Sequence, residues 1–202
     1  MLVGGIITVL TTQQLIERYS NLSDPAGRIS RDVKNGKLIP LVKGLYETNP
    51  DTHGALLAQT IYGPSYLSFD YALYSAGLIP EAVYSTFTSA TYNKRKIKTY
   101  KNKFGTFIYR DVPSEVFCKG VLIFVENGYS YHMATPEKAL CDKLYSLPPA
   151  KNSRMFYEML FEDLRIDETT LFELNRDEII SLAPLYRSTN LYRLERLLKG
   201  RK

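Results

Sequence analysis

Apolar residues recur at helical spacing near the start of the chain. Leu15, Ile16 and Tyr19 follow Thr12, which predicts a short helix over residues 13–20 with Thr12 as its N-cap. Residues 1–10 are apolar and include glycine, a pattern more typical of a strand than of a helix. We therefore expect the chain to enter its first helix directly from a strand.

A second helix is expected over residues 24–35. Ser23 can act as its N-cap, Pro25 suits its first turn, and Gly36 ends it. On a helical wheel the apolar and the charged residues of this segment separate. Ala26, Ile29 and Val33 form the packing side, and the opposite, mostly cationic side carries Arg28, Arg31, Lys34 and Asn35 together with Asp24 and Asp32.

Residues 37–46 then predict two short strands around a turn with lysine at its tip. A helix, a turn, a basic helix and a two-stranded ribbon follow one another in this order in a winged helix-turn-helix. Such a basic helix reads base edges in the major groove, and ribbon lysines reach the phosphates. The candidate DNA-binding residues are Arg28, Ser30, Arg31, Lys34, Asn35, Lys37 and Lys43.

Two observations keep other interpretations of this module open. The usual winged helix begins with a further helix ahead of its first strand, and residues 1–10 do not predict one. That helix is either missing or supplied by the rest of the chain. The alternative is a small α/β cap whose basic face is only solvated, as most charged helix faces are.

Beyond residue 50 the pattern changes to alternating helices and strands. Helices are expected over residues 51–61 and from Pro64 to Ala76, and strands over residues 82–88, 96–101 and 104–110. Asn127-Gly128 between apolar runs predicts a hairpin of residues 121–125 and 129–132. Thr135 and Pro136 start a helix with Leu140, Leu144 and Leu147 on its apolar face. Four more helices are expected over residues 153–165, 168–174, 176–182 and 190–199, capped by Ser153, Asp167, Asn175 and Asn190.

These patterns predict an α+β protein of two domains. Residues 1–50 would form an N-terminal winged helix-turn-helix, with or without its first helix. Residues 51–202 would form a mixed α+β C-terminal domain that ends in helices. No run approaches the roughly 18 apolar residues of a membrane helix. No signal peptide is expected either, because no Lys or Arg precedes the apolar start.

The charge is distributed unevenly around a net value of +5. Residues 84–110 contain seven basic residues and no acid, which favours an anionic partner, and nucleic acid is the commonest. The alternative is a solvated basic hairpin. The candidate second basic surface consists of Lys94, Arg95, Lys96, Lys98, Lys101 and Lys103.

The search for catalytic chemistry finds no convergent set of groups. The chain lacks zinc, phosphate-loop and nucleophile-elbow motifs, and its two cysteines are too few for a disulfide framework. Cys141 with His132 could form a nucleophile and base, but Cys141 lies beside an apolar helix face, so a core thiol is expected. Asp111, Glu115 and Glu126 lack the lysine spacing of restriction-type nucleases. We expect no enzyme, no metal, no cofactor and a reduced, cytoplasmic setting.

Several segments, in order and at matching spacing, resemble the AbiEi family, the antitoxin and transcriptional-regulator half of bacterial type IV toxin–antitoxin systems. The most diagnostic is 134–142, and the others are 36–46, 62–69, 72–73, 77–81, 88–91, 105–110 and 162–166. The resemblance implies a non-enzymatic protein of abortive infection and phage defence. Its winged helix would repress its own operon at inverted repeats in the promoter DNA. Its C-terminal domain would counter an adjacently encoded nucleotidyltransferase toxin without forming a stable complex.

Two functions of different classes therefore remain. The first is a DNA-binding autorepressor with antitoxin activity. The second is an interaction module with a degenerate winged helix, which contacts another protein or RNA. A solitary regulator with no toxin partner is a variant of these. The segment of residues 94–103 suits either function.

Overall fold

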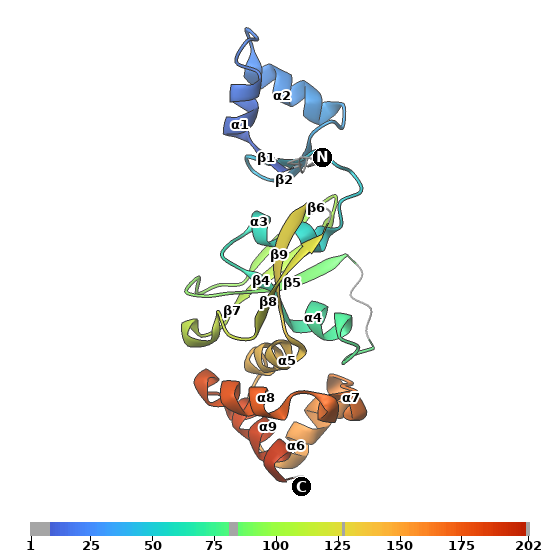
Figure 1. Ribbon diagram of the computed structural model, residues 1–202, viewed down its shortest axis with the longest axis vertical. Helices are drawn as coiled ribbons and strands as arrows, with labels where there is room; N and C mark the ends of the chain where they lie inside the picture. The colour runs from blue at the N-terminus through green and yellow to red at the C-terminus, as the bar shows by residue number, and fades with distance from the viewer. Residues whose placement is uncertain (1–8, 81–84, 127, 201–202) are drawn as a thin grey trace, which may run out of the picture.

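The structure is a computed structural model that describes residues 9–80, 85–126 and 128–200 (Figure 1). Its elements are stacked along one long axis. A small module lies at the N-terminal end, a six-stranded sheet occupies the middle, and a group of helices forms the C-terminal end. The chain is therefore mixed α+β with a helical C-terminal part, as the sequence predicts.

The N-terminal module (residues 9–47) combines two helices with a three-stranded antiparallel sheet. The sheet order is β1-β3-β2, so the first strand pairs with the last one. Leu15, Ile29 and Leu38 form the buried core of the module. Its elements are β1 (Val9–Thr11), α1 (Thr12–Arg18), α2 (Pro25–Lys34), β2 (Ile39–Val42) and β3 (Leu45–Glu47).

The N-cap of each helix in the module lies one residue away from the predicted cap. Thr11, not Thr12, caps α1, because its side chain accepts the Gln14 N–H while the Gln14 side chain accepts the Thr11 N–H. Asp24, not Ser23, caps α2 by accepting the Gly27 N–H at 2.8 Å. A Cβ at Gly27 would lie 1.7 Å from an Asp24 carboxylate oxygen, so a larger residue there would require the Asp24 side chain to shift.

The central sheet has six strands in the order β6-β7-β5-β4-β9-β8. The β5–β7 and β4–β9 pairs are parallel, and the other pairs are antiparallel. The elements of this region are η1 (Gly54–Leu57), α3 (Ala58–Ile61), β4 (Tyr66–Leu67), α4 (Phe69–Ser75), β5 (Thr86–Thr91), β6 (Lys98–Asn102), β7 (Gly105–Asp111), η2 (Ser114–Val116), β8 (Val121–Glu126) and β9 (Tyr129–Ala134).

The sequence misplaces two of the inner strands. The predicted helix from Pro64 starts only at Phe69, because Tyr66 and Leu67 form β4 between β5 and β9. The predicted strand 82–88 becomes β5 at 86–91, and residues 82–84 lie outside the described residues. Ser89 and Thr91 are fully buried in β5 although they are polar, so hydrophobicity gives no signal for this strand. The predicted helix over 51–61 is likewise shorter and starts at Gly54.

The C-terminal helices pack below α5, which lies against the sheet (Figure 1). Asp167 and Asn175 cap α7 and α8 as predicted, but Asn152 rather than Ser153 caps α6. Asn190 is buried and holds the loop after α5 through the Leu144 carbonyl and the Ala150 N–H. The elements are α5 (Pro136–Tyr145), α6 (Ser153–Glu158), a π-turn η3 (Met159–Asp163), α7 (Glu168–Glu173), α8 (Arg176–Leu182), η4 (Ala183–Tyr186) and α9 (Thr189–Gly200).

One hydrophobic cluster joins the N-terminal module to the central sheet. Ile39 and Leu41 of β2 belong to the same buried cluster as Leu57 and Phe107. The Tyr129 hydroxyl of β9 also donates to the buried Glu47 carboxylate at 2.9 Å. Residues on either side of the predicted boundary at residue 50 therefore share one core.

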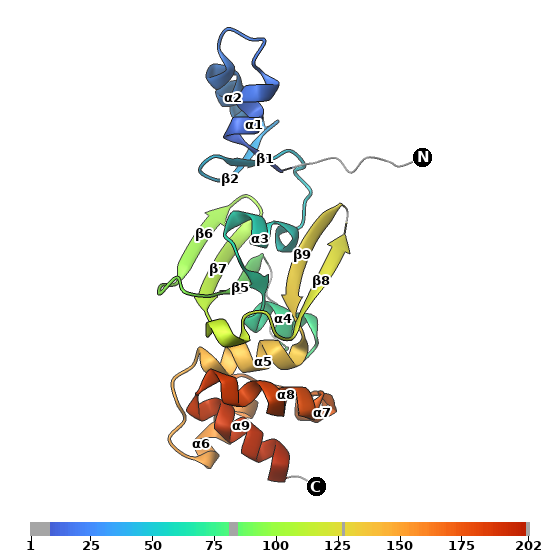
Figure 2. The same cartoon turned by 60° about the vertical axis from the view of Figure 1, so that its left-hand side comes forward.

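The two edge strands of the sheet differ in character (Figure 2). Strand β6 carries Lys98 and Lys101. Strand β8 exposes apolar side chains instead, with Leu122 at 52%, Ile123 at 68% and Val125 at 77% relative exposure. Within the described residues, no helix has the length and apolar character to cross a membrane.

Candidate nucleic-acid interface

The exposed side of α2 is less uniformly cationic than the helical wheel indicates. Asp32 was expected on the charged side, but it is buried at 4% exposure and accepts from Arg28 Nε and the Tyr19 hydroxyl, each at 2.9 Å. The Arg28 guanidinium lowers the pKa of the Asp32 carboxyl below its ordinary value. Ala26, expected on the packing side, is exposed. Arg28 thus contributes to the packing of the module as well as to its surface.

The other candidate residues of α2 and its C-terminal end are exposed. Arg31 leaves 61% of its side chain exposed and lies 3.8 Å from the Asp24 carboxylate. A pair at that distance on the surface is worth little, so the guanidinium stays available. The Ser30 hydroxyl donates to the Ala26 carbonyl at 3.2 Å within the helix. Lys34, Asn35 and Lys37 are exposed at the end of α2.

The turn between β2 and β3 presents lysine to solvent, as predicted. Lys43 and Gly44 form the turn, and Gly44 takes a φ of +83°, which favours glycine. The Gly44 carbonyl accepts the Thr12 N–H at 2.9 Å and so ties the turn to the start of α1. Helix α1 and the ribbon therefore hold a fixed relation, and Lys43 extends from an anchored turn.

The second basic segment divides into a loop and a hairpin. In the loop, Asp111 accepts the Lys94 and Arg95 N–H groups at 2.7 and 2.6 Å and the Thr91 hydroxyl at 2.7 Å. The Lys94 ammonium lies 5.2 Å from the centre of the Tyr62 ring. The loop thus holds Lys94, Arg95 and Lys96, whereas Lys98, Lys101 and Lys103 lie on β6 and the turn that follows it.

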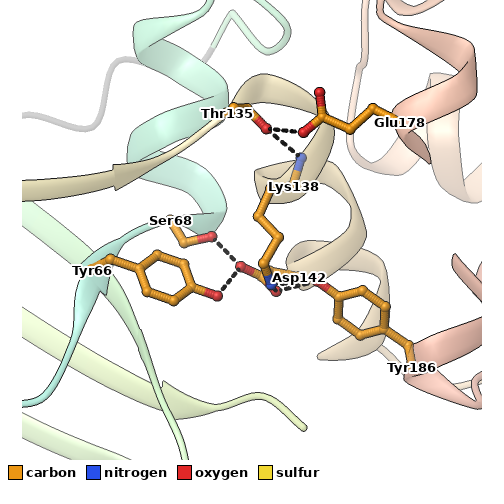
Figure 3. A network of polar contacts seen from close by, with 7 residues as sticks. All are labelled: Tyr66, Ser68, Thr135, Lys138, Asp142, Glu178 and Tyr186. Carbon is orange, nitrogen blue, oxygen red and sulfur yellow. Dashed lines mark hydrogen bonds and ion pairs between the residues drawn. The ribbon is translucent and has the colours of Figure 1, made fainter. Parts of the chain in front are cut away.

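A buried polar network around Asp142 was not predicted from the sequence. Asp142 of α5 accepts from Lys138 Nζ at 2.5 Å and from the Tyr186 hydroxyl at 2.6 Å (Figure 3). Its other oxygen accepts from the Ser68 hydroxyl at 2.7 Å and the Tyr66 hydroxyl at 2.9 Å. Lys138, Asp142 and Ser68 are fully buried.

This buried network joins three parts of the fold. Tyr66 and Ser68 come from β4 and its end, Lys138 and Asp142 from α5, and Tyr186 from η4. Desolvation lowers the pKa of Lys138 and raises the pKa of the Tyr66 and Tyr186 hydroxyls. The network connects the sheet to the C-terminal helices. Because the Lys138 ammonium is not exposed to solvent, the network offers no accessible reactive group. The i, i+4 spacing of Lys138 and Asp142 is the only local signal for it.

Three of the residues weighed for catalysis, Cys141, Asp111 and Glu115, have structural surroundings in this fold. Cys141 is fully buried, so the expected core thiol is confirmed, and burial raises its pKa. Asp111 holds the basic loop, and Glu115 pairs with Arg187 at 3.1 Å. Within residues 9–80, 85–126 and 128–200, no three His, Cys, Asp or Glu side chains gather into a set that could hold a metal ion.

Comparison with known proteins informs the fold alone. No family model matches the chain, and a search of curated proteins finds no match. Among solved structures, the chain is similar to the RV2827C protein from Mycobacterium tuberculosis, with a TM-score of 0.51 and 14% sequence identity. The likeness covers 96% of this chain and 77% of that protein, so it extends through the N-terminal module, the sheet and the helices.

Proposed function

We propose that this protein is a DNA-binding transcriptional regulator whose N-terminal module is a winged helix-turn-helix. The observation that carries the proposal is the combination of an exposed cationic α2 with a lysine-tipped ribbon in one anchored module. The order β1-α1-α2-β2-β3 and the sheet order β1-β3-β2 support it. In this assignment α2 enters the major groove and the β2–β3 ribbon is the wing.

The candidate residues divide by role in this proposal. Arg31 is the best candidate for a base contact, because it is exposed and only weakly paired. Lys34 and Asn35 lie at the C-terminal end of the same helix and would contact DNA beside Arg31. Ser30 would contact a base edge or a phosphate. Lys37 and Lys43 flank the ribbon and would bind phosphates. Arg28 would act partly through Asp32, since it holds that buried carboxylate.

The central region supports the sheet of the N-terminal module. The sheet packs through Ile39 and Leu41 against Leu57 and Phe107 of the central region. We infer that this packing stabilises the module. The DNA-binding part would then depend on residues beyond 50 for its stability.

The antitoxin role is proposed on the resemblance to the AbiEi family. In that role the chain would repress its own operon, and residues 51–202 would counter a nucleotidyltransferase toxin without a stable complex. The most diagnostic segment of the resemblance, residues 134–142, coincides with the start of α5 and contains Lys138 and Asp142 of the buried network. We infer that the pattern of this segment reflects the packing of α5. The antitoxin role itself is tested by a growth assay, which measures whether the protein rescues cells that express a cognate toxin.

An interaction module remains the second candidate, because β8 offers an exposed apolar edge. A partner strand could pair with that edge without any use of α2. Binding of a partner protein that is abolished by Ile123→Lys but not by Arg31→Ala would favour this candidate over DNA regulation.

The test of DNA reading compares Arg31→Ala with Arg154→Ala by gel shift on the chain's own promoter and on random duplex. Arg154 is also exposed and also paired with an acid, but it lies on α6 at the opposite end of the molecule. Arg31→Ala should cost about 1–3 kcal/mol on the promoter and little on random DNA. Arg154→Ala should behave as wild type. Equal affinity of the wild type for both duplexes would rule out sequence reading.

A further inference from the structure

The two edges of the central sheet are protected to different degrees (Figure 2). On the β6 edge, Lys98 and Lys101 place charges that discourage pairing with another strand. Strand β8 contains no lysine, and its Ile123 and Val125 are 68% and 77% exposed. An exposed apolar strand at a sheet edge is characteristic of a contact surface.

The sequence of β8 is complementary to itself in the antiparallel direction. Its apolar run, Val121-Leu122-Ile123-Phe124-Val125, has a valine at each end and Ile123 in the middle. Pairing of two copies about Ile123 therefore sets valine opposite valine, leucine opposite phenylalanine, and isoleucine opposite isoleucine. Cross-strand pairs of β-branched and aromatic side chains stabilise a sheet. Two-fold symmetric pairs are also the commonest association between identical chains.

The charges that flank this apolar run agree with the antiparallel direction. Lys119 precedes β8 and Glu126 ends it, and both residues are exposed. Neither has an ion-pair partner in the part of the chain that the structure describes. Antiparallel pairing about Ile123 brings each Glu126 next to Lys119 of the second copy. Opposite charges then meet at both ends of the pair, whereas a parallel pair would set like charges side by side.

A hollow beside β8 gives a second copy further apolar contacts. It has a volume of about 290 Å³, and its lining includes Val121 and Ile123 of β8, His132 of β9, and Phe117. Val121 and Ile123 share one face of the strand, because alternate residues point to the same side. In the pairing about Ile123, Val125 of the second copy lies opposite Val121 on that face, where it borders the hollow.

We propose that β8 pairs with β8 of a second copy of this chain, antiparallel and centred on Ile123. The two central sheets then join into one continuous sheet. The inference goes beyond the proposed function and does not depend on DNA binding. A contact made by one pair of strands lies at the small end of protein interfaces, so we expect a dissociation constant of about 1–100 µM.

The experiment measures the mass of the full chain by sedimentation equilibrium from about 1 to 300 µM at one salt concentration. The wild type should pass from 23.1 kDa toward twice that mass. Ile123→Lys sets two ammonium groups opposite each other at the centre of the pair and should raise the dissociation constant roughly tenfold or more. The matched control is Ile97→Lys, because Ile97 is 62% exposed and lies just before β6 at the other edge. The control should associate like the wild type.

Charge reversal tests the direction of the pair. Lys119→Glu alone, or Glu126→Lys alone, sets like charges at both ends and should raise the dissociation constant roughly 2–30-fold. The double reversal restores opposite charges between the two copies and should return the constant to near its wild-type value. Circular dichroism confirms that each variant is folded.

Three results would each overturn this inference. The first is a wild type that stays at 23.1 kDa through the whole concentration range. The second is an Ile123→Lys variant that associates like the control. The third is a double reversal that associates no more tightly than the single reversals. None of these results bears on the proposed function, because no variant replaces a candidate DNA-binding residue.

Discussion

Replacement of the buried Lys138 tests whether the polar network around Asp142 stabilises the fold. Lys138→Met keeps a long apolar side chain but deprives Asp142 of its paired ammonium. Asp142 would still accept from Tyr66, Ser68 and Tyr186. Breaking one side of a buried pair costs about 3–5 kcal/mol, and these three remaining donors favour the lower part of that range.

That loss is large against a typical unfolding free energy of about 5–15 kcal/mol. For a chain of this size it corresponds to a fall in Tm of about 6–20 °C. Urea unfolding followed by far-UV circular dichroism and tyrosine fluorescence measures it, since the chain contains no tryptophan. The slope m should stay constant, which shows that the native surface is preserved.

A second substitution distinguishes lost charge pairing from lost packing. Asp142→Asn removes the carboxylate charge, so in the Lys138→Met background the amide no longer needs a cation. The double variant should be more stable than Lys138→Met alone, which gives a favourable coupling between the two changes. A Lys138→Met variant within 1 kcal/mol of wild type, or two strictly additive losses, would refute this account of the network.

Two further predictions follow from pairing and burial. Arg28→Ala should destabilise the protein by about 1–3 kcal/mol, because the buried Asp32 carboxylate would then keep only its hydrogen bond from Tyr19. The control Arg31→Ala should leave stability unchanged. Thermal melts of the two variants measure the difference. Burial raises the pKa of Tyr71 to about 12, while the unfolded value is about 10. Its contribution to stability is therefore complete below pH 10 and is lost as pH rises from 10 to 12, by about 1.4 kcal/mol per pH unit. Urea titrations at pH 9, 10 and 11 with tyrosinate absorbance should show the loss, and unchanged stability at pH 11 would contradict it.

The sequence predicts elements whose signals are local. Thr135 caps α5 by accepting the Lys138 N–H, with Pro136 in the first turn, as the motif indicates. The hairpin of β8 and β9 also forms as expected around residues 127–128, of which residue 127 lies outside the described residues. In both cases neighbours in the sequence supply the interaction that defines the element.

The features missed from the sequence depend on distant partners. Asp32 looks like a surface residue of an amphipathic helix until Tyr19 and Arg28 are placed around it. Asn190 looks like a helix cap, but its side chain bonds to Pro148 and Ala150 in the loop after α5, 42 and 40 residues earlier. The helical wheel names the candidate DNA-binding residues of α2. The tertiary contacts show in addition that Arg28 pairs with the buried Asp32, whereas Arg31 stays exposed.

The shared core across residue 50 also changes what a truncation can test. A fragment of residues 1–50 would expose Ile39 and Leu41, and it would leave Glu47 without the Tyr129 hydroxyl. The proposed repression and antitoxin roles are therefore better tested separately by surface substitutions in the full chain than by deletion. If a fragment of residues 1–50 did not bind DNA, the result would reflect unfolding of the fragment and would not test the DNA-binding residues.

We expect the apolar edge of β8 to promote association between chains at high concentration. An exposed edge strand can pair with a strand of another chain. In β8, Leu122, Ile123 and Val125 add exposed apolar side chains that favour such pairing. In dilute buffer the net charge of +5 keeps molecules apart, but the screening length falls from about 30 Å at 0.01 M salt to about 3 Å at 1 M. High salt therefore weakens the charge repulsion that keeps the β8 edges of different chains apart, so turbidity should rise with ionic strength.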